Sequence, residues 1–358
     1  MTGPGTRPHT VGVVVPVYRG EQVLGRLVEE IRALAPDADS VVVSPEGREL
    51  VVTEIVLVHD CGPDRSDEVI RTLAGTDARV HPVWLSRNFG QHAATLAGIA
   101  TTTTDWVVTM DEDGQHDPAD IPRLLDVAVG TASQVVYGRG TNDAPHGWWR
   151  NAASETVKWV ADRLISGESL ADFSSFRLLL GEVGRAVAAY GGPDVYLDVA
   201  LTWIARPAQV CPVVLRSEDR PSGYSLGRLL AHFGRLLLTS GVRPLRLITW
   251  IGAIVAVAGF LYAIYAIVTR ITHDAQAPGW TSVIVAVLVV GGVLLISLGV
   301  IAEYLSVVVG TALGRPTYVV VTDPQRGPLG ASAAPSAGRS AEAPAEVPPG
   351  TPAADDAT

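Results

Sequence analysis

The sequence predicts an α/β domain with a mostly parallel sheet, followed by two apolar helices that form a membrane hairpin. Short apolar runs alternate with helical patterns over the first part of the chain, to about residue 215. Two uncharged apolar runs of about 20 residues follow, and each is long enough to cross a bilayer. A mean hydropathy of +0.27 with only 18% charged residues is high for a soluble enzyme, which supports this division.

Five apolar runs and three helical patterns make up the predicted α/β domain. The runs are four to six residues long and end in polar or glycine-containing sequence, as buried strands do. Strands are expected at residues 11–16, 54–58, 80–85, 106–109 and 134–138, and helices at 21–34, 67–73 and 90–100. Residues 40–50 are expected to form an additional loop or hairpin, to which the sequence assigns no function.

Charge and cysteine content exclude two common kinds of site. A net charge of −10 and a pI near 5.3 argue against nucleic-acid binding, which needs a basic surface. The two cysteines, Cys61 and Cys211, are too few for a disulfide framework and lack the spacing of a zinc site. We therefore expect reduced thiols and no nucleic-acid partner.

An acidic loop follows the fourth predicted strand, Trp106–Thr109. Asp111 and Asp113 are two residues apart, so in an extended chain their carboxylates point to the same side. Open α/β sheets bind ligands beyond the carboxyl ends of their strands, and paired carboxylates there suit a hard divalent cation that also binds substrate phosphates. The alternative is a polar turn without a metal, because the Asp-x-Asp motif is short.

The second part of the chain has the features of a membrane protein. Residues 224–244 carry apolar side chains at helical spacing with Arg228, His232 and Arg235 between them, which predicts an amphipathic helix at a membrane surface. The two spans are expected at about 247–268 and 280–302. The alternatives are an ordinary domain helix for the first feature and a buried hairpin of a soluble protein for the second.

Basic residues predict the orientation of the hairpin. Arg243 and Arg246 precede the first span and Arg315 follows the second, while the connecting loop holds only Arg270. The positive-inside rule places the N-terminal domain and the C-terminal tail in the cytosol. The tail, residues 323–358, is rich in Ala, Pro, Gly and Ser and is expected to be disordered.

Several motifs occur in the order found in one enzyme family. They are Pro16 and Tyr18 with Glu21, Asp60 to Ser66, Ser86 to Gly90, Asp111 to Gln115, Asp172 with Phe176–Arg177–Leu178, Ser222 to Leu226, and Glu303–Tyr304 with Gly314–Arg315–Pro316. In this order they resemble the polyprenyl-phosphate glycosyltransferases of family 2, the bacterial relatives of dolichol-phosphate mannose synthase. The sequence departs from that pattern at His59, Arg19–Gly20, Gly62 and Gln91, where the family often has an acidic residue, Asn-Glu, Ser and Lys.

The resemblance implies a GT-A (Rossmann-like) fold and roles for individual residues. Donor nucleotide binding would fall to Pro16, Tyr18, Glu21, Asp60, Arg87, Asp111, Asp113 and Gln115. Asp113, with Asp111, would hold Mg²⁺ or Mn²⁺. The acceptor phosphate would be bound by Arg177, Arg220 and Ser222, and Asp172, Arg177 and Asp113 would be the catalytic residues.

Structural alternatives exist for four of these roles. Pro16 and Tyr18 could serve only turn formation and packing, and Asp60 could cap the helix that follows it. Arg177 could form an ion pair with Asp172, and Arg220 could be only a positive-inside charge before the first span.

These observations predict an organisation and a function. The expected parts are a cytosolic domain (1–223), an interface helix (224–244), two transmembrane helices (245–310), a short cytosolic segment (311–322) and a tail (323–358). The resemblance implies an inverting, multi-pass enzyme of the inner membrane that transfers one sugar from a nucleotide donor to undecaprenyl or decaprenyl phosphate, and that assembles as a homo-oligomer, a tetramer in the family. The alternatives are a membrane glycosyltransferase that extends a glycan directly and a non-catalytic membrane scaffold.

Overall fold

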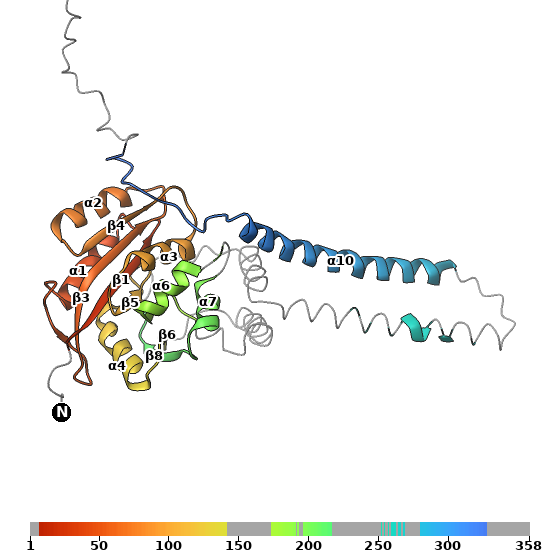
Figure 1. The fold of residues 1–358 in the computed structure, drawn as a ribbon, viewed down its shortest axis with the longest axis horizontal. Helices are drawn as coiled ribbons and strands as arrows, with labels where there is room; N and C mark the ends of the chain where they lie inside the picture. Colours follow the sequence, from red (N-terminus) through yellow and green to blue (C-terminus); the bar gives the residue numbers. More distant parts are fainter. Residues whose placement is uncertain are drawn as a thin grey trace, which may run out of the picture. The chain divides into compact units, whose positions relative to one another are not determined.

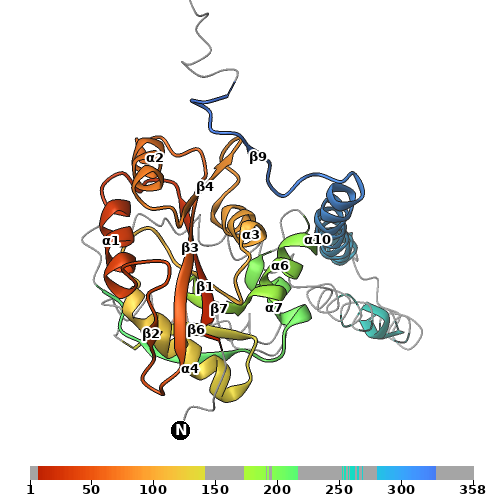
Figure 2. The ribbon, with the colours of Figure 1, turned by 60° about the vertical axis from the view of Figure 1, so that its left-hand side comes forward.

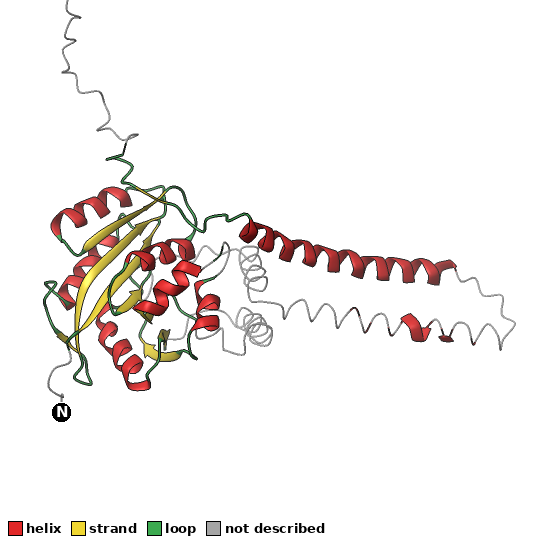
Figure 3. Cartoon of the chain, viewed as in Figure 1, coloured by secondary structure: helices red, strands yellow, loops and turns green. Residues whose placement is uncertain are grey.

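The computed structural model describes residues 7–141, 173–190, 192, 196–216 and 280–327, together with isolated positions between 252 and 268. Most of the described residues form an α/β domain in which helices cover both faces of one sheet (Figure 1). Figure 3 shows the strands of this sheet with helices beside them. The strands come from both ends of the described chain, since the first is β1 (His9–Val17) and the last is β9 (Val320–Val321).

The sheet is mixed, with four parallel strands at its centre. Its order is β8-β6-β7-β5-β1-β3-β4-β9. The central strands are β5 (Trp106–Thr109), β1, β3 (Glu49–His59) and β4 (Val80–Leu85), and each neighbouring pair among them is parallel.

The prediction of a mostly parallel sheet is wrong on either side of the four central strands. Strand β7 (Arg177–Leu180) runs antiparallel to both β5 and β6 (Val135–Gly140), and β9 is antiparallel to β4. Strand β8 (Gln209–Val213) is parallel to β6. The sequence-based argument considered only strands joined by helical crossovers, which must be parallel, and did not recognise β7 or β9 as strands.

Helices divide between the two faces of the sheet, as Figure 2 shows. One apolar core joins the sheet to α1 (Leu24–Leu34), α2 (Ser66–Thr76) and α4 (Ile121–Thr131). The other core joins it to α3 (Gln91–Thr101), α6 (Gly181–Tyr190) and α7 (Leu197–Ile204). Central strands are therefore buried on both faces, which explains their continuous runs of valine, leucine and isoleucine.

All five predicted strands and three predicted helices are present, with boundaries shifted by a few residues. The additional hairpin at residues 40–50 is also confirmed, because β2 (Val42–Val43) pairs antiparallel with the start of β3. Asp126 of α4 holds its turn, accepting hydrogen bonds from Ser44 Oγ (2.5 Å) and Arg48 Nη1 (2.7 Å). The short helix η1 (Pro118–Asp120) leads into α4.

Helix α10 (Trp280–Ala312) is the longest described helix, with 33 residues. Many of its apolar side chains are exposed, among them Val287, Leu295 and Ile296. No helix among the described residues meets the combined length and apolarity that a membrane crossing requires. The predicted amphipathic helix at 224–244 and most of the predicted first span lie outside the described residues.

The chain after α10 forms the edge strand of the sheet. Val320 and Val321 of β9 pair with Leu85 and Trp84 of β4, and Ser86 N donates a hydrogen bond of 3.0 Å to the carbonyl oxygen of Val319. The partly buried Tyr318 packs against the core formed with α3, α6 and α7. A segment more than 230 residues from β4 in sequence therefore completes the sheet beside the loop that follows β4.

His59, the last residue of β3, is a buried histidine. Its side chain is 9% exposed and lies edge-on to Trp84, with the ring centroids 5.5 Å apart. Its Nε2 accepts or donates no hydrogen bond within the part of the chain that the structure describes. Burial lowers the pKa of His59, because a charged imidazolium would lose its hydration there.

Replacing Tyr318 by alanine should destabilise the domain. We expect the free energy of unfolding to fall by about 1–2 kcal/mol, because a partly buried aromatic side chain is removed from an apolar core. Tyr190→Ala is the matched control, since Tyr190 is 82% exposed, and it should change stability by less than about 0.5 kcal/mol. Chemical denaturation of the purified full chain measures both; equal effects would contradict the docking of the segment that follows α10.

Acid should destabilise the domain through His59. Because the folded state holds His59 with a lowered pKa, the unfolded chain binds the proton first as the pH falls below about 6.5. This contribution to stability is complete above that pH and is lost, at up to about 1.4 kcal/mol per pH unit, as the pH falls toward the folded pKa.

The comparison of two histidine variants isolates this effect. Stability is measured between pH 5 and 8, a range that brackets the ordinary histidine pKa of about 6.5. His59→Phe should flatten the pH dependence, whereas the matched control His81→Phe, at an exposed position of β4, should leave it as in the wild type. A His59→Phe profile as steep as that of the wild type would show that other groups cause the acid sensitivity.

Candidate functional site

The predicted site residues meet where the central strands end. Strand β1 lies between β3 and β5, and Val17 of β1 pairs with His59 of β3. The backbone N–H of Met110 donates to Val14 of β1, so the acidic loop begins beside the same strand. Loops after β1, β3 and β5 therefore lie at one edge of the sheet, the position at which open α/β sheets bind ligands.

Glu112 joins the acidic loop to the loop after β1. Its carboxylate accepts hydrogen bonds from the backbone N–H groups of Tyr18 (3.0 Å) and Arg19 (2.9 Å). Burial raises the pKa of Glu112, and these two backbone hydrogen bonds oppose the rise. A Cβ atom at Gly20 would lie only 2.8 Å from Oε2 of Glu112, so this close approach of the two loops favours glycine there.

The loops after β1 and β3 are also joined. Asp64 accepts hydrogen bonds from Ser66 Oγ (2.6 Å) and from the backbone N–H of Glu21 (3.1 Å). In return, Arg65 N donates to Oε2 of Glu21 (3.3 Å). At Gly62 a Cβ atom would lie 1.7 Å from the carbonyl oxygen of Tyr18, so no other residue fits this contact. Gly20 and Gly62 are two of the residues that depart from the family pattern. At both, the glycine backbone closely approaches a residue of a neighbouring loop.

Asp60 binds the loop that enters α3. Its two carboxylate oxygens accept hydrogen bonds from the backbone N–H groups of Phe89 (2.7 Å) and Gly90 (2.8 Å). The alternative that Asp60 caps the following helix, α2, is therefore wrong; it holds the start of a later helix instead. Burial raises the pKa of Asp60, and the two backbone bonds and the charge of Arg87 lower it in part.

Asp111 and Asp113 differ in how their carboxylates are engaged. Asp111 accepts hydrogen bonds of 2.5 Å from both Gln91 Nε2 and Ser175 Oγ. Asp113 accepts one bond, of 3.0 Å, from the backbone N–H of Gln115. Among the described residues, no group of three or more His, Cys, Asp or Glu side chains is placed to hold a metal ion. Two carboxylates fit a hard cation that takes its other ligands from substrate phosphates and water.

Arg177 lies inside the domain. It is 3% exposed, forms an ion pair with Asp198 of α7, and its Nε donates to Thr109 Oγ1 (3.1 Å). The structure gives Arg177 an ion pair with Asp198, whereas the alternative partner Asp172 lies outside the described residues. The role of Arg177 in binding the acceptor phosphate stays a prediction; in the structure its guanidinium is buried and paired with Asp198.

The other predicted residues are placed as follows. Pro16 is buried at the end of β1, whereas Tyr18 is 40% exposed with the Arg19 guanidinium 5.6 Å from its ring centre. Arg87 is exposed and lies 4.0 Å from the ring centre of Phe89. The structure does not describe Asp172, Arg220 or Ser222, so the predicted acceptor side lies outside the described residues.

Four residues of this region were not predicted as part of the site. Glu112, Ser175 and Asp198 are described above, and the fourth is His116, whose Nδ1 accepts a 3.2 Å hydrogen bond from the backbone N–H of Asp111. Burial lowers the pKa of His116, which keeps Nδ1 free to accept this bond. The signal for Glu112 and His116 was their position beside the two aspartates; Ser175 and Asp198 are distant in sequence, and no motif points to them.

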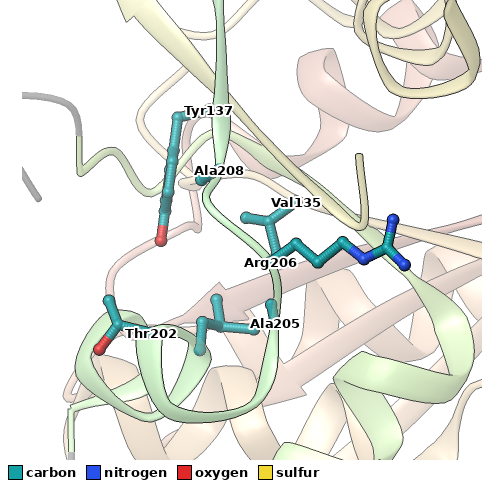
Figure 4. A pocket seen from close by; sticks show the side chains of 7 residues that line it. Val135, Tyr137, Thr202, Ala205, Arg206 and Ala208 are labelled. Carbon is teal, nitrogen blue, oxygen red and sulfur yellow. The ribbon is translucent and has the colours of Figure 1, made fainter. Parts of the chain in front are cut away.

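A shallow hollow lies elsewhere on the domain, between β6 and the end of α7 (Figure 4). It is lined mainly by apolar side chains, among them Val135, Tyr137, Leu201 and Ala205, with Arg206 at one side. None of the predicted site residues lines it. The acidic edge of the sheet is therefore the candidate site.

Comparison with known proteins identifies the family of the chain. Residues 12–180 match the glycosyl transferase family 2, and residues 243–308 match the GtrB C-terminal hairpin. The undecaprenyl-phosphate 4-deoxy-4-formamido-L-arabinose transferase of Pseudomonas aeruginosa is 32% identical, over 87% of this chain and 89% of that protein. The bactoprenol glucosyl transferase of Shigella phage SfX is 28% identical, over 87% of this chain and 98% of that protein.

A solved structure is also similar. The mannosyltransferase PcManGT from Pyrobaculum calidifontis, in complex with GDP-Man and Mn²⁺, has a TM-score of 0.45 and 15% identity, over 87% of this chain and 89% of that chain. The two matched families together with the relative at 32% identity establish the relationship. The chain belongs to glycosyl transferase family 2, and its mixed-sheet α/β domain has the GT-A type of fold.

Proposed function

We propose that this protein transfers one sugar from a nucleotide-sugar donor to a polyprenyl phosphate, with inversion at the anomeric carbon. The observation that carries the proposal is the joint match, on one chain, to a family 2 transferase domain and to the GtrB hairpin. Relatives that cover the same 87% of the chain are named as transferases acting on undecaprenyl phosphate or bactoprenol.

The donor would bind at the carboxyl edge of the sheet. The proposed metal is Mg²⁺ or Mn²⁺, held by Asp113 with Asp111, and when bound it would neutralise the negative charge that grows on the diphosphate leaving group. Asp113 is the first choice as ligand because its carboxylate accepts only one hydrogen bond from the described residues, whereas both oxygens of Asp111 are engaged.

The loops after β1, β3 and β4 would bind the nucleotide. Tyr18 and Arg87 are exposed at this edge and could contact base or ribose, with Pro16, Glu21 and Gln115 shaping the same loops. Asp60 accepts one backbone hydrogen bond on each oxygen, and each oxygen keeps a further lone pair for a base N–H.

The acceptor phosphate needs cationic and hydrogen-bonding groups rather than a strong base. A phosphate monoester is largely dianionic at neutral pH, since its second pKa lies near 6, and is already a nucleophile. We assign its binding to Arg220 and Ser222, with Asp172 orienting the acceptor. Arg177 is assigned to the support of the site, because it is buried against Asp198.

The C-terminal part would hold the enzyme at its lipid substrate. We propose a cytosolic catalytic domain (1–223), an interface helix (224–244), two transmembrane helices (245–310), a cytosolic segment (311–322) and a disordered tail (323–358). The hairpin match at 243–308 and the exposed apolar side chains of α10 support a lipid environment for this part in the inner membrane. A homo-oligomer is proposed from the family resemblance.

Sugar transfer to lipid tests the proposal. The full chain in detergent is incubated with polyprenyl phosphate and a panel of radiolabelled nucleotide sugars, with Mg²⁺, Mn²⁺ or EDTA. We expect label in the lipid fraction with one donor, and its loss with EDTA. Transfer to a glycan acceptor without a lipid product would instead support direct glycan extension, and folded protein without any transfer would support a scaffold.

The Asp113→Asn variant tests the metal site in the same assay. It should lower transfer by about 100-fold or more, since metal stabilisation of a leaving group contributes several kcal/mol. Asp39→Asn, at an exposed position away from the acidic loop, is the matched control and should transfer as the wild type does. Transfer by Asp113→Asn at the wild-type rate would remove Asp113 from the proposed site.

A further inference from the structure

The Asp111 carboxylate is held on both oxygens by neutral donors from two other segments. Gln91 Nε2, at the first residue of α3, donates to Oδ1, and Ser175 Oγ, just before β7, donates to Oδ2; both distances are 2.5 Å. Two bonds to different oxygens fix the direction and the plane of a carboxylate, which one bond does not.

Two further hydrogen bonds hold the backbone of Ser175 in place. Arg177 Nε donates to Thr109 Oγ1 (3.1 Å), and the Thr109 hydroxyl donates to the carbonyl oxygen of Ser175 (2.6 Å). The Ser175 hydroxyl then donates to Asp111. The carbonyl oxygen and the hydroxyl of Ser175 are separate groups, so the bonds from Arg177 and Thr109 hold the backbone of Ser175 while its hydroxyl reaches Asp111.

The residues that hold the backbone of Ser175 are buried. Thr109 is 2% exposed, Arg177 is 3% exposed, and Asp198, the ion-pair partner of Arg177, is 9% exposed. The hydroxyl of Tyr137 also donates to Asp198 (3.0 Å). The position of Ser175 is therefore set by core residues of β5, β7 and α7, and not by the loop alone.

Neutral donors have a specific advantage at a cation site. A lysine or arginine paired with Asp111 would orient the carboxylate but would also cancel its charge, and so weaken its attraction for a divalent ion. The amide of Gln91 and the hydroxyl of Ser175 orient the carboxylate while leaving its negative charge in place.

We propose that Ser175, supported by Arg177 and Thr109, is a positioning residue that together with Gln91 orients the Asp111 carboxylate for the metal–donor complex. This inference rests on the proposed function, because it assumes that the acidic loop binds a metal ion. It concerns the affinity for that metal and not the identity of the sugar. Arg177 acts in it as a buried support for the donor side of the site.

Ser175→Ala tests the proposal. Without the hydroxyl, Oδ2 of Asp111 loses one of the two bonds that orient it, and a hydrogen bond to a charged group corresponds to about a tenfold change in affinity or more. We expect the Mn²⁺ concentration for half-maximal transfer to rise about tenfold. At saturating Mn²⁺, kcat should fall by less than about threefold, because the metal can then restore the geometry.

Two further variants separate orientation from folding. Ser175→Thr keeps the hydroxyl and should restore the Mn²⁺ dependence of the wild type. Ser174→Ala is the matched control, since the Ser174 hydroxyl accepts only a 3.2 Å bond from the backbone N–H of Phe176 among the described residues, and it should leave the Mn²⁺ dependence unchanged. If Ser175→Ala does not fold, Gln91→Ala removes the other donor from an exposed position and serves the same test.

Direct Mn²⁺ binding gives a second readout that does not depend on transfer. Electron paramagnetic resonance of free Mn²⁺, with the full chain and UDP, should show about tenfold weaker binding by Ser175→Ala than by the wild type or Ser174→Ala. Unchanged or tighter Mn²⁺ binding would overturn the proposal, even if the melting temperature fell. Weaker Mn²⁺ binding by Ser175→Ala in a protein that transfers no sugar would support it while overturning the proposed function.

Discussion

The candidate site depends on carboxylates that accept hydrogen bonds from the backbone N–H groups of neighbouring loops. Glu112 holds Tyr18 and Arg19, and Asp60 holds Phe89 and Gly90. Loops usually vary in position, but here each loop is fixed by a side chain that begins at the end of a buried strand. The sheet therefore fixes the geometry of this edge. Substrate binding would not have to offset the conformational entropy lost when these loops become ordered.

This construction places several acidic groups in a partly buried region, which has an electrostatic cost. Burial raises the pKa of both Asp60 and Glu112, and the backbone hydrogen bonds they accept lower it in part. A nucleotide diphosphate approaching the same edge would meet like charge. A divalent cation held by the carboxylates would offset this repulsion, so the acidity of the edge and the proposed metal dependence would have one physical origin.

The sequence predicted local structure well and long-range pairing poorly. Each predicted strand was correct because apolar runs such as Val80–Leu85 reflect burial on both faces of the sheet. Strand β7 was missed because its antiparallel position between β5 and β6 depends on residues far apart in sequence. For the same reason nothing in the sequence pointed to Asp198 on α7 as an ion-pair partner of Arg177.

The residues that depart from the family pattern bear on whether the site has lost its catalytic activity. A decayed site would be expected to lose contacts where its sequence changes. Here Gly62 lies against the Tyr18 carbonyl where no Cβ fits, and Gly20 donates its N–H to Ser66 Oγ at 2.8 Å. Gln91 donates to Asp111 in the acidic loop. Because Gly20, Gly62 and Gln91 all make close contacts within the site, these substitutions fit a maintained site better than a non-catalytic scaffold.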